Sequence, residues 1–283
     1  MYRIIVPIDF SEESLHGLNL ALLFAKKISC KIEMVYVQRK SLDYNPGPKE
    51  GELKYAEKEF KKIQEAYKDK IPQHSSLQYI IKTGRIYREI VNQAKSFKDS
   101  IIVASTHGAS GFEKFFIGSN AFKIISATNK PVITIRGVEL PKNINTIVLP
   151  LDITSDTRQK VPFTAELAKI FNSEIHIVTI TSMQTDDISN KLAAYAKQVS
   201  EYLDAHNIQN STKALVGSKL TDLILDYSIQ VNADLISIMT EQVSDANFIL
   251  GTAAQEMLNK SSIPILSINP KELHVSGAFR TQG

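Results

Sequence analysis

The chain has 283 residues, with 33 Lys and Arg against 30 Asp and Glu, a net charge of +3, 43% hydrophobic residues, one Cys and no Trp. Its length allows two domains of ordinary size, each able to bury its own core, and no apolar run approaches the ~20 residues of a membrane span. We expect a cytoplasmic protein with no membrane or nucleic-acid partner, because Cys30 has no partner for a disulfide or zinc cluster and the first residues reach Asp9 too soon for a signal peptide.

Short β-branched runs alternate with helical patterns along the first half, which is typical of a parallel sheet covered by helices. The first strand, near 3–8, ends at Asp9, and Ser11 followed by two acidic residues then starts a helix at 12–29. The other strands are expected near 31–37, 77–82, 100–105 and 131–136, and the other helices near 51–69, 85–97 and 119–128.

The second half repeats this plan. Arg3-Ile-Ile-Val-Pro-Ile-Asp9 returns as Thr146-Ile-Val-Leu-Pro-Leu-Asp152, and Gly118-Ser119 returns as Gly251-Thr252. Strands are expected near 146–151, 174–180, 212–216, 234–239 and 264–268, with helices near 156–171, 187–206, 219–231 and 252–260. The prediction is an α/β fold made of two tandem, doubly wound domains, each with a five-stranded parallel sheet.

Turn chemistry and composition set the expected limits of the domains. The segment 138–145 carries Pro and polar residues between two strand-like runs, as a linker does. We expect a first domain at 1–137, a second at 146–270 and a polar tail at 271–283.

Candidate site residues follow the strands of the first half, because ligands bind outside the carboxyl ends of strands in such sheets. The fourth strand leads into Ser105-Thr-His107-Gly108, and Gly118-Ser119-Asn120 opens a helix, where glycines and unsatisfied amides suit phosphate. Ser119 either donates a hydroxyl to the ligand or caps its helix, and Asp9 either binds ribose hydroxyls or ends its strand.

These residues carry a resemblance to the universal stress protein family in its tandem, two-domain form. The nucleotide-binding members carry Gly-x2-Gly-x9-Gly-[Ser/Thr], and the first half has Ser105-x2-Gly108-x9-Gly118-Ser119, with Ser105 in place of the first glycine. The resemblance implies that both domains have the Rossmann-like, nucleotide-binding α hydrolase type of fold. It also implies that ATP, with or without Mg²⁺, binds the first domain. The implied contacts of the phosphates, ribose and adenine are, together, Ile8, Asp9, Val37, Ser105, His107, Gly108, Gly118, Ser119 and Asn120.

The second half lacks this loop, because Met239-Thr-Glu241-Gln242 stands where Ser105 to Gly108 stood. Glu241 would repel a phosphate, so we expect no cofactor in the second domain.

The resemblance implies a stress-response or regulatory module that binds ATP and has no catalytic residues of its own. The two halves would pack as a pseudo-dimer through their final strands, and a second chain or another protein could associate with that unit. Two alternatives stay open at this point: a scaffold that acts without nucleotide, and an enzyme with slow ATP hydrolysis or phosphoryl transfer.

Overall fold

The computed structural model describes residues 1–38, 50–106, 118–137, 140–240 and 251–270. The chain divides into two compact units, residues 1–140 and 141–283, called here the first and second unit. The division falls inside the expected linker, 138–145, although the expected domain limits themselves remain predictions. The expected tail, 271–283, lies outside the described residues.

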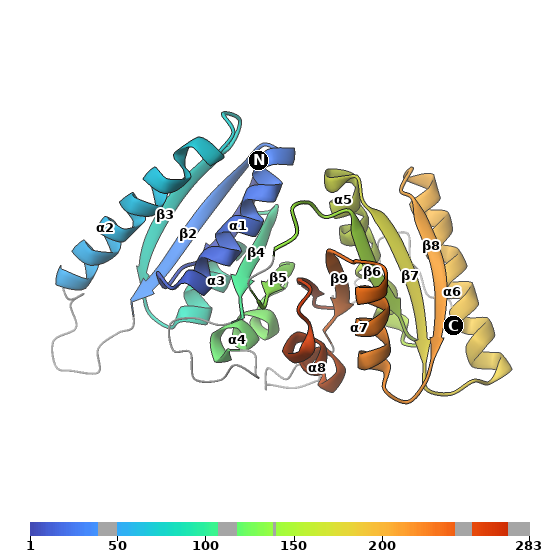
Figure 1. Cartoon of the computed structure of the whole chain (residues 1–283). Helices are drawn as coiled ribbons and strands as arrows, with labels where there is room; N and C mark the ends of the chain where they lie inside the picture. The colour runs from blue at the N-terminus through green and yellow to red at the C-terminus, as the bar shows by residue number, and fades with distance from the viewer. Residues whose placement is uncertain (39–49, 107–117, 138–139, 241–250, 271–283) are drawn as a thin grey trace. The chain divides into compact units, whose positions relative to one another are not determined.

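The first unit is a parallel sheet with helices on both faces, as predicted (Figure 1). Its strands lie in the order β3-β2-β1-β4-β5. Its elements, in chain order, are β1 (Tyr2–Pro7), α1 (Glu12–Lys27), β2 (Cys30–Gln38), α2 (Glu50–Tyr67), β3 (Ser76–Thr83), α3 (Ile86–Lys95), β4 (Ser100–Ser105), α4 (Ser119–Ala127) and β5 (Val132–Ile135).

Strand β1 lies in the middle of this sheet and explains its layered core. Ile4, which has no exposed surface, lies opposite Ile32 in β2 and Ile101 in β4. Ile5 and Val6 are equally buried although successive side chains point to opposite faces. A continuous apolar run of this kind is typical of a strand covered by helices on both sides.

Two hydrogen bonds from β2 show which helices lie on which face. Glu33 accepts from Gln93 of α3 at 2.5 Å, and the Tyr36 hydroxyl donates to Glu52 of α2 at 2.9 Å. Residues 33 and 36 differ by an odd number, so they point to opposite faces. Helix α2 therefore covers one face and α3 covers the other. The hydroxyl of Tyr67 in α2 donates to Asn19 of α1, so α1 lies on the face of α2, and α4 packs against α3 on the opposite face.

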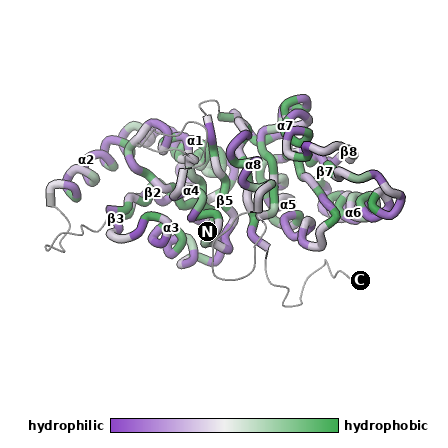
Figure 2. Tube along the Cα trace, turned by 90° about the horizontal axis from the view of Figure 1, so that it is seen from below, coloured by the Kyte–Doolittle hydropathy of each residue, from purple (hydrophilic) through white to green (hydrophobic). Residues whose placement is uncertain are grey.

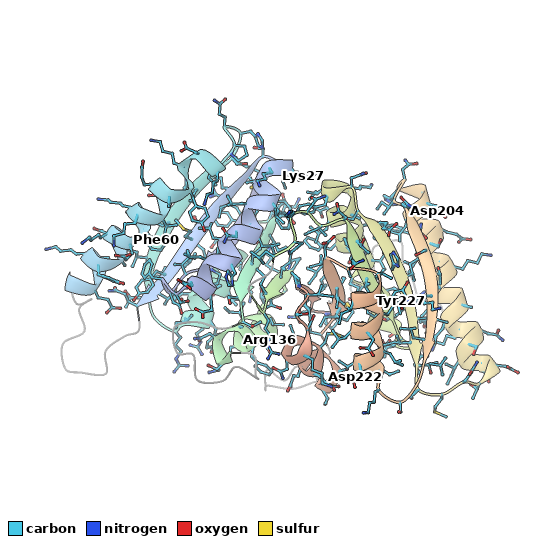
Figure 3. All side chains as sticks on the ribbon, viewed as in Figure 1. Lys27, Phe60, Arg136, Asp204, Asp222 and Tyr227 are labelled. Carbon is cyan, nitrogen blue, oxygen red and sulfur yellow. The ribbon has the colours of Figure 1, made fainter. Side chains whose placement is uncertain are left out.

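Helix α2 covers its face with few apolar residues. Its trace in Figure 2 is largely hydrophilic, and Figure 3 shows Phe60 between this helix and the sheet. Phe60 has no exposed surface and stacks on Tyr79 of β3, with ring centroids 4.6 Å apart. One buried aromatic side chain thus anchors a helix whose other side is solvated.

The second unit has the same architecture, with strands in the order β8-β7-β6-β9-β10. The predicted fold class is therefore confirmed in both units. Its elements are β6 (Thr146–Leu151), α5 (Val161–Phe171), β7 (Glu174–Thr181), α6 (Asp186–Ala205), β8 (Asn210–Val216), α7 (Leu220–Gln230), β9 (Leu235–Met239), α8 (Thr252–Lys260) and β10 (Ile265–Ile268).

One helix of the second unit differs from its prediction. The helix expected at 156–171 is a 3₁₀ turn at Ser155–Arg158 followed by α5 from Val161. In the first unit, Gly17 stands eight residues after Asp9, the aspartate that ends β1. A Cβ added at Gly17 would come within 3.1 Å of the Val103 carbonyl oxygen. The second unit has Lys160 eight residues after Asp152, so its first helix cannot approach the sheet as closely as α1 does at Gly17.

Candidate functional site

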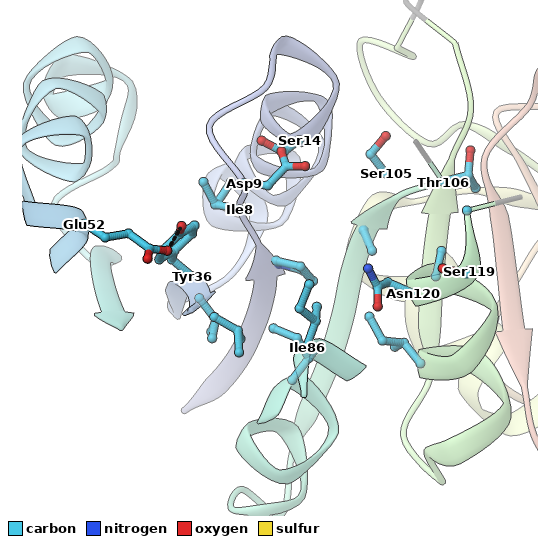
Figure 4. Close-up of a pocket in the computed structure, with 18 residues that line it drawn as sticks. Ile8, Asp9, Ser14, Tyr36, Glu52, Ile86, Ser105, Thr106, Ser119 and Asn120 are labelled. Atoms are coloured by element: carbon cyan, nitrogen blue, oxygen red, sulfur yellow. Dashed lines mark hydrogen bonds between the residues drawn. The ribbon is translucent and has the colours of Figure 1, made fainter. Parts of the chain in front are cut away.

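A cavity of about 500 Å³ lies at the carboxyl ends of β1, β2 and β4 in the first unit (Figure 4). The order of the strands reverses here, because the chain leaves β1 toward β2 on one side and returns to β4 on the other. Such a switch point is where open α/β sheets bind ligands. The volume lies within the range of small-molecule pockets, roughly 300–1,000 Å³.

The cavity brings together the described residues that the sequence nominated. Seven of them line it, namely Ile8, Asp9, Val37, Ser105, Gly118, Ser119 and Asn120. The other two, His107 and Gly108, lie outside the described residues. The assignment of these nine residues as ligand contacts remains a prediction.

One end of the cavity is built from the start of α4. Gly118 caps this helix, and its N–H donates to the Thr106 carbonyl oxygen at 2.7 Å. A Cβ at Gly118 would come within 2.6 Å of that same oxygen, so only glycine allows the approach. The N–H groups of a first helical turn have no acceptor within the helix and carry a partial positive charge, and they suit an anionic group such as phosphate.

Asp9 is held by a turn at the end of β1. Its Oδ1 accepts from the Ser11 N–H at 3.1 Å and from the Ser11 hydroxyl at 2.5 Å, while Ser11 itself caps α1. Phe10 between them has φ +66°, a conformation that is uncommon for a bulky residue. Its ring packs against Tyr36 and Phe60, with centroids 4.9 and 5.0 Å away, and this contact compensates for the backbone strain.

The far side of the cavity contains residues that sequence reasoning missed. Tyr36 and Glu52 line it and are joined by the 2.9 Å hydrogen bond. Burial, followed by the contact with Glu52, raises the pKa of Tyr36 to about 12. No spacing signal links a strand residue to a helix residue 16 positions later in the chain, so this pair is found only through the tertiary structure.

An apolar wall closes the cavity between these two ends. It comes from Ile86 and Ile90 of α3 and Ile124 of α4, facing Val35 and Val37 of β2. The helical pattern of α3 and α4 predicts buried faces, but it does not tell which apolar residues border a ligand rather than the core. The cavity therefore combines an apolar wall with a few polar groups, as small-molecule sites do.

The second unit repeats the aspartate turn but fills its neighbourhood differently. Asp152 Oδ1 accepts from the N–H and hydroxyl of Thr154, as Asp9 does from Ser11. Five residues after each aspartate stands a hydroxyl residue, Ser14 in the first unit and Thr157 in the second. Ser14 lines the cavity of the first unit, whereas the Lys160 amine binds the Thr157 carbonyl oxygen at 2.6 Å.

Lys160 therefore brings its amine next to Thr157, the counterpart of a residue that lines the cavity of the first unit. The residue is 2% exposed. Burial lowers the pKa of its amine to about 8, and the nearby Asp152 carboxylate opposes this shift only partly. The expected obstacle in this unit, Glu241, lies outside the described residues.

Two negative findings concern the described ranges. Within them, no three His, Cys, Asp or Glu side chains are grouped so as to hold a metal ion. No helix in the part of the chain that the structure describes is long and apolar enough to cross a membrane.

Comparison with known proteins gives matches over both units. Universal stress protein YxiE of Bacillus subtilis (strain 168) is 28% identical over 145 residues, which are 47% of this chain and 98% of that protein. Universal stress protein MJ0531 of Methanocaldococcus jannaschii is 29% identical over 148 residues, 47% of this chain and 81% of that protein. The crystal structure of a universal stress protein from Archaeoglobus fulgidus DSM 4304 has a TM-score of 0.75 at 18% identity and covers 94% of this chain and 98% of its own.

The family model of the universal stress proteins matches the chain twice, at residues 1–136 and 143–269. The two matches account for the internal repeat and for the two sheets of the same strand order. The chain belongs to the universal stress protein family and carries two of its domains in tandem.

Proposed function

We propose that the first unit binds ATP in the cavity at the ends of β1, β2 and β4 and acts as a nucleotide-dependent regulatory module of the stress response. The observation that carries the proposal is the placement of Asp9 and the start of α4 around one cavity of about 500 Å³. A carboxylate suits ribose hydroxyls, and a helix N-terminus suits phosphates. The family match supports the same assignment.

The proposed contacts follow the order of groups along the nucleotide. The first turn of α4, with Gly118, Ser119 and Asn120, would hold the phosphates together with Ser105, His107 and Gly108. Asp9 would bind the ribose, and Ile8 and Val37 would border the adenine. Asp9 is already oriented by Ser11 and needs little reordering to accept a hydrogen bond.

A divalent cation such as Mg²⁺ fits this proposal as a companion of the phosphates. The described lining includes the carboxylates of Asp9 and Glu52, and it includes no Lys or Arg. Phosphate charge in such a lining needs a counter-charge. Mg²⁺ is usually bound through one or two carboxylates, phosphate oxygens and water, and an ion held by the phosphate oxygens and water would supply this counter-charge.

The same proposal includes a binding role rather than a catalytic one, pairing of the two domains within the chain, association with a further chain or protein, and a cytoplasmic location. Family membership supports these parts. The cavity geometry favours none of the alternatives, neither hydrolysis nor action as a scaffold without nucleotide.

Calorimetric titration of the nucleotide-free protein with ATP and Mg²⁺ tests the proposal. We expect about one site per chain, and an Asp9→Asn variant should bind at least ~10-fold more weakly, because a hydrogen bond to a charged group is worth about 1.5–3 kcal/mol. Asp152→Asn is the matched control, since Asp152 makes the same turn in the second unit. Absence of heat would favour the scaffold, and equal losses in both variants would place the effect outside the cavity.

A further inference from the structure

The end of the cavity away from α4 carries a carboxylate that binding of phosphate and ribose does not explain. Glu52 of α2 lines the cavity there, and its Oε1 accepts the Tyr36 hydroxyl at 2.9 Å. Figure 4 shows Glu52 and Tyr36 on one side, Asp9 between, and Ser105, Thr106 and Ser119 on the other. A nucleotide with its phosphates at α4 and its ribose at Asp9 therefore places its base toward Glu52.

The second unit has no counterpart of this pair at the same register. Val35 lies opposite Pro7 in the first unit, and Val178 lies opposite Pro150 in the second. Thr179 thus takes the place of Tyr36, and the second unit has no tyrosine there to hold a carboxylate. The pair is therefore not part of the plan that the two units share.

The chemistry of the pair limits what it can bind. An ionised carboxylate only accepts hydrogen bonds, and it has about four lone-pair positions, of which the Tyr36 hydroxyl uses one. It attracts an amino group and repels a carbonyl oxygen, so a 6-oxopurine can satisfy it only by turning its 1-NH, or in guanine its 2-amino group, toward the carboxylate. Adenine carries an amino group at its 6-position, whereas hypoxanthine and guanine carry a carbonyl oxygen there.

We propose that Glu52 is a specificity-determining residue, which accepts a hydrogen bond from the 6-amino group of the purine and so selects adenine over 6-oxopurines. This inference rests on the proposed binding of nucleotide in the same cavity. Tyr36 acts as a positioning residue, because its hydroxyl fixes the carboxylate while its ring packs on Phe10 beside Asp9.

Competitive titration with ATP and ITP, which differ at the 6-position, tests the proposal on the full chain. The parent should bind ATP at least ~10-fold more tightly than ITP, since the wrong base leaves the carboxylate facing an oxygen. In Glu52→Gln the ratio should fall toward one, because an amide both donates and accepts. The amide oxygen can still accept the Tyr36 hydroxyl, so the fold has no reason to change.

Two further variants complete the test. Glu65→Gln removes the same charge from α2 at an exposed position and should keep the parent ratio. Tyr36→Phe keeps the ring but releases the carboxylate, and it should give an intermediate ratio. An unchanged ratio in Glu52→Gln with ATP still bound, or a parent preference for GTP, would overturn this proposal alone. Failure of the parent to bind ATP would overturn the proposed function together with it.

Discussion

Lys160 and Gly17 occupy equivalent positions in the two units and lead to opposite local structures. Gly17 lets α1 approach β4, whereas the Lys160 side chain is buried with its amine bonded to Thr157. A buried amine costs free energy mainly in its charged form, because the interior solvates an ammonium poorly. The second unit thus carries a destabilising group at the position where Gly17 brings α1 close to β4 in the first unit.

The pKa of Lys160 predicts how stability changes with pH. The amine has a pKa of about 8 in the folded protein, against an ordinary value near 10.5. Between these values the unfolded chain binds a proton that the folded chain does not, so the free energy of unfolding should rise as the pH goes from 8 to 10.5. Below pH 8 the folded protein carries the full penalty.

A Lys160→Met variant should therefore be more stable than the parent at pH 7, by at most ~3 kcal/mol, and should lose the rise between pH 8 and 10.5. Urea unfolding followed by circular dichroism at pH 7, 8.5 and 10 measures both effects. Lys197→Met, at a side chain 78% exposed, is the control and should leave the slope unchanged. If the free energy of unfolding of the parent does not rise between pH 8 and 10.5, Lys160 is charged and well paired in the folded protein.

Gly118 offers a second test at a single residue. In Gly118→Ala the new Cβ would meet the Thr106 carbonyl oxygen at 2.6 Å, so the start of α4 must shift. We expect ATP binding to weaken at least ~10-fold, since misplaced donors lose hydrogen bonds to charged phosphate. Gly51→Ala in α2, where a Cβ meets nothing within 4 Å, should bind ATP like the parent in the same titration. Equal affinity of both variants would remove α4 from the phosphate site.

At the scale of elements, periodicity and capping predict most of the fold. Ser11 was expected to start a helix, and it caps α1 by accepting from the Ser14 N–H. The one clear departure, the 3₁₀ turn before α5, has a signal in the repeat itself, because lysine replaces Gly17 at the equivalent place. The spacing of apolar residues does not reveal the effect of that replacement, because the replacement changes how closely a helix can approach the sheet.

The candidate site is predicted from sequence only where its residues end strands or begin helices. Asp9 and Ser119 lie at such places, and the structure brings both to one cavity. Tyr36 and Glu52 come together because Phe10 and Phe60 pack α2 over the end of β2. Such a contact depends on tertiary packing between elements far apart in the chain, and local spacing does not encode it.

At the scale of the whole molecule, two copies of one plan have diverged in opposite directions. Each unit has five strands in the same order and its own buried core. The first unit retains a cavity beside Asp9, whereas the second unit has a buried lysine beside Asp152. A ligand that binds only the folded first unit stabilises that unit directly, and it reaches the second only through coupling between them.

Hydrogen exchange measured by mass spectrometry separates these two effects. With ATP and Mg²⁺ at 100 times the dissociation constant, the first unit should gain about 2.7 kcal/mol, and exchange that proceeds through its unfolding should slow about 100-fold. We expect this slowing at the amides of the first unit that exchange by its unfolding, in the buried strands β1, β2 and β4 above all, with β6 to β10 unchanged. Asp9→Asn at the same ATP concentration should show less slowing. Equal slowing in both units would contradict this prediction and show that the proposed pairing couples the stability of the second unit to nucleotide binding in the first.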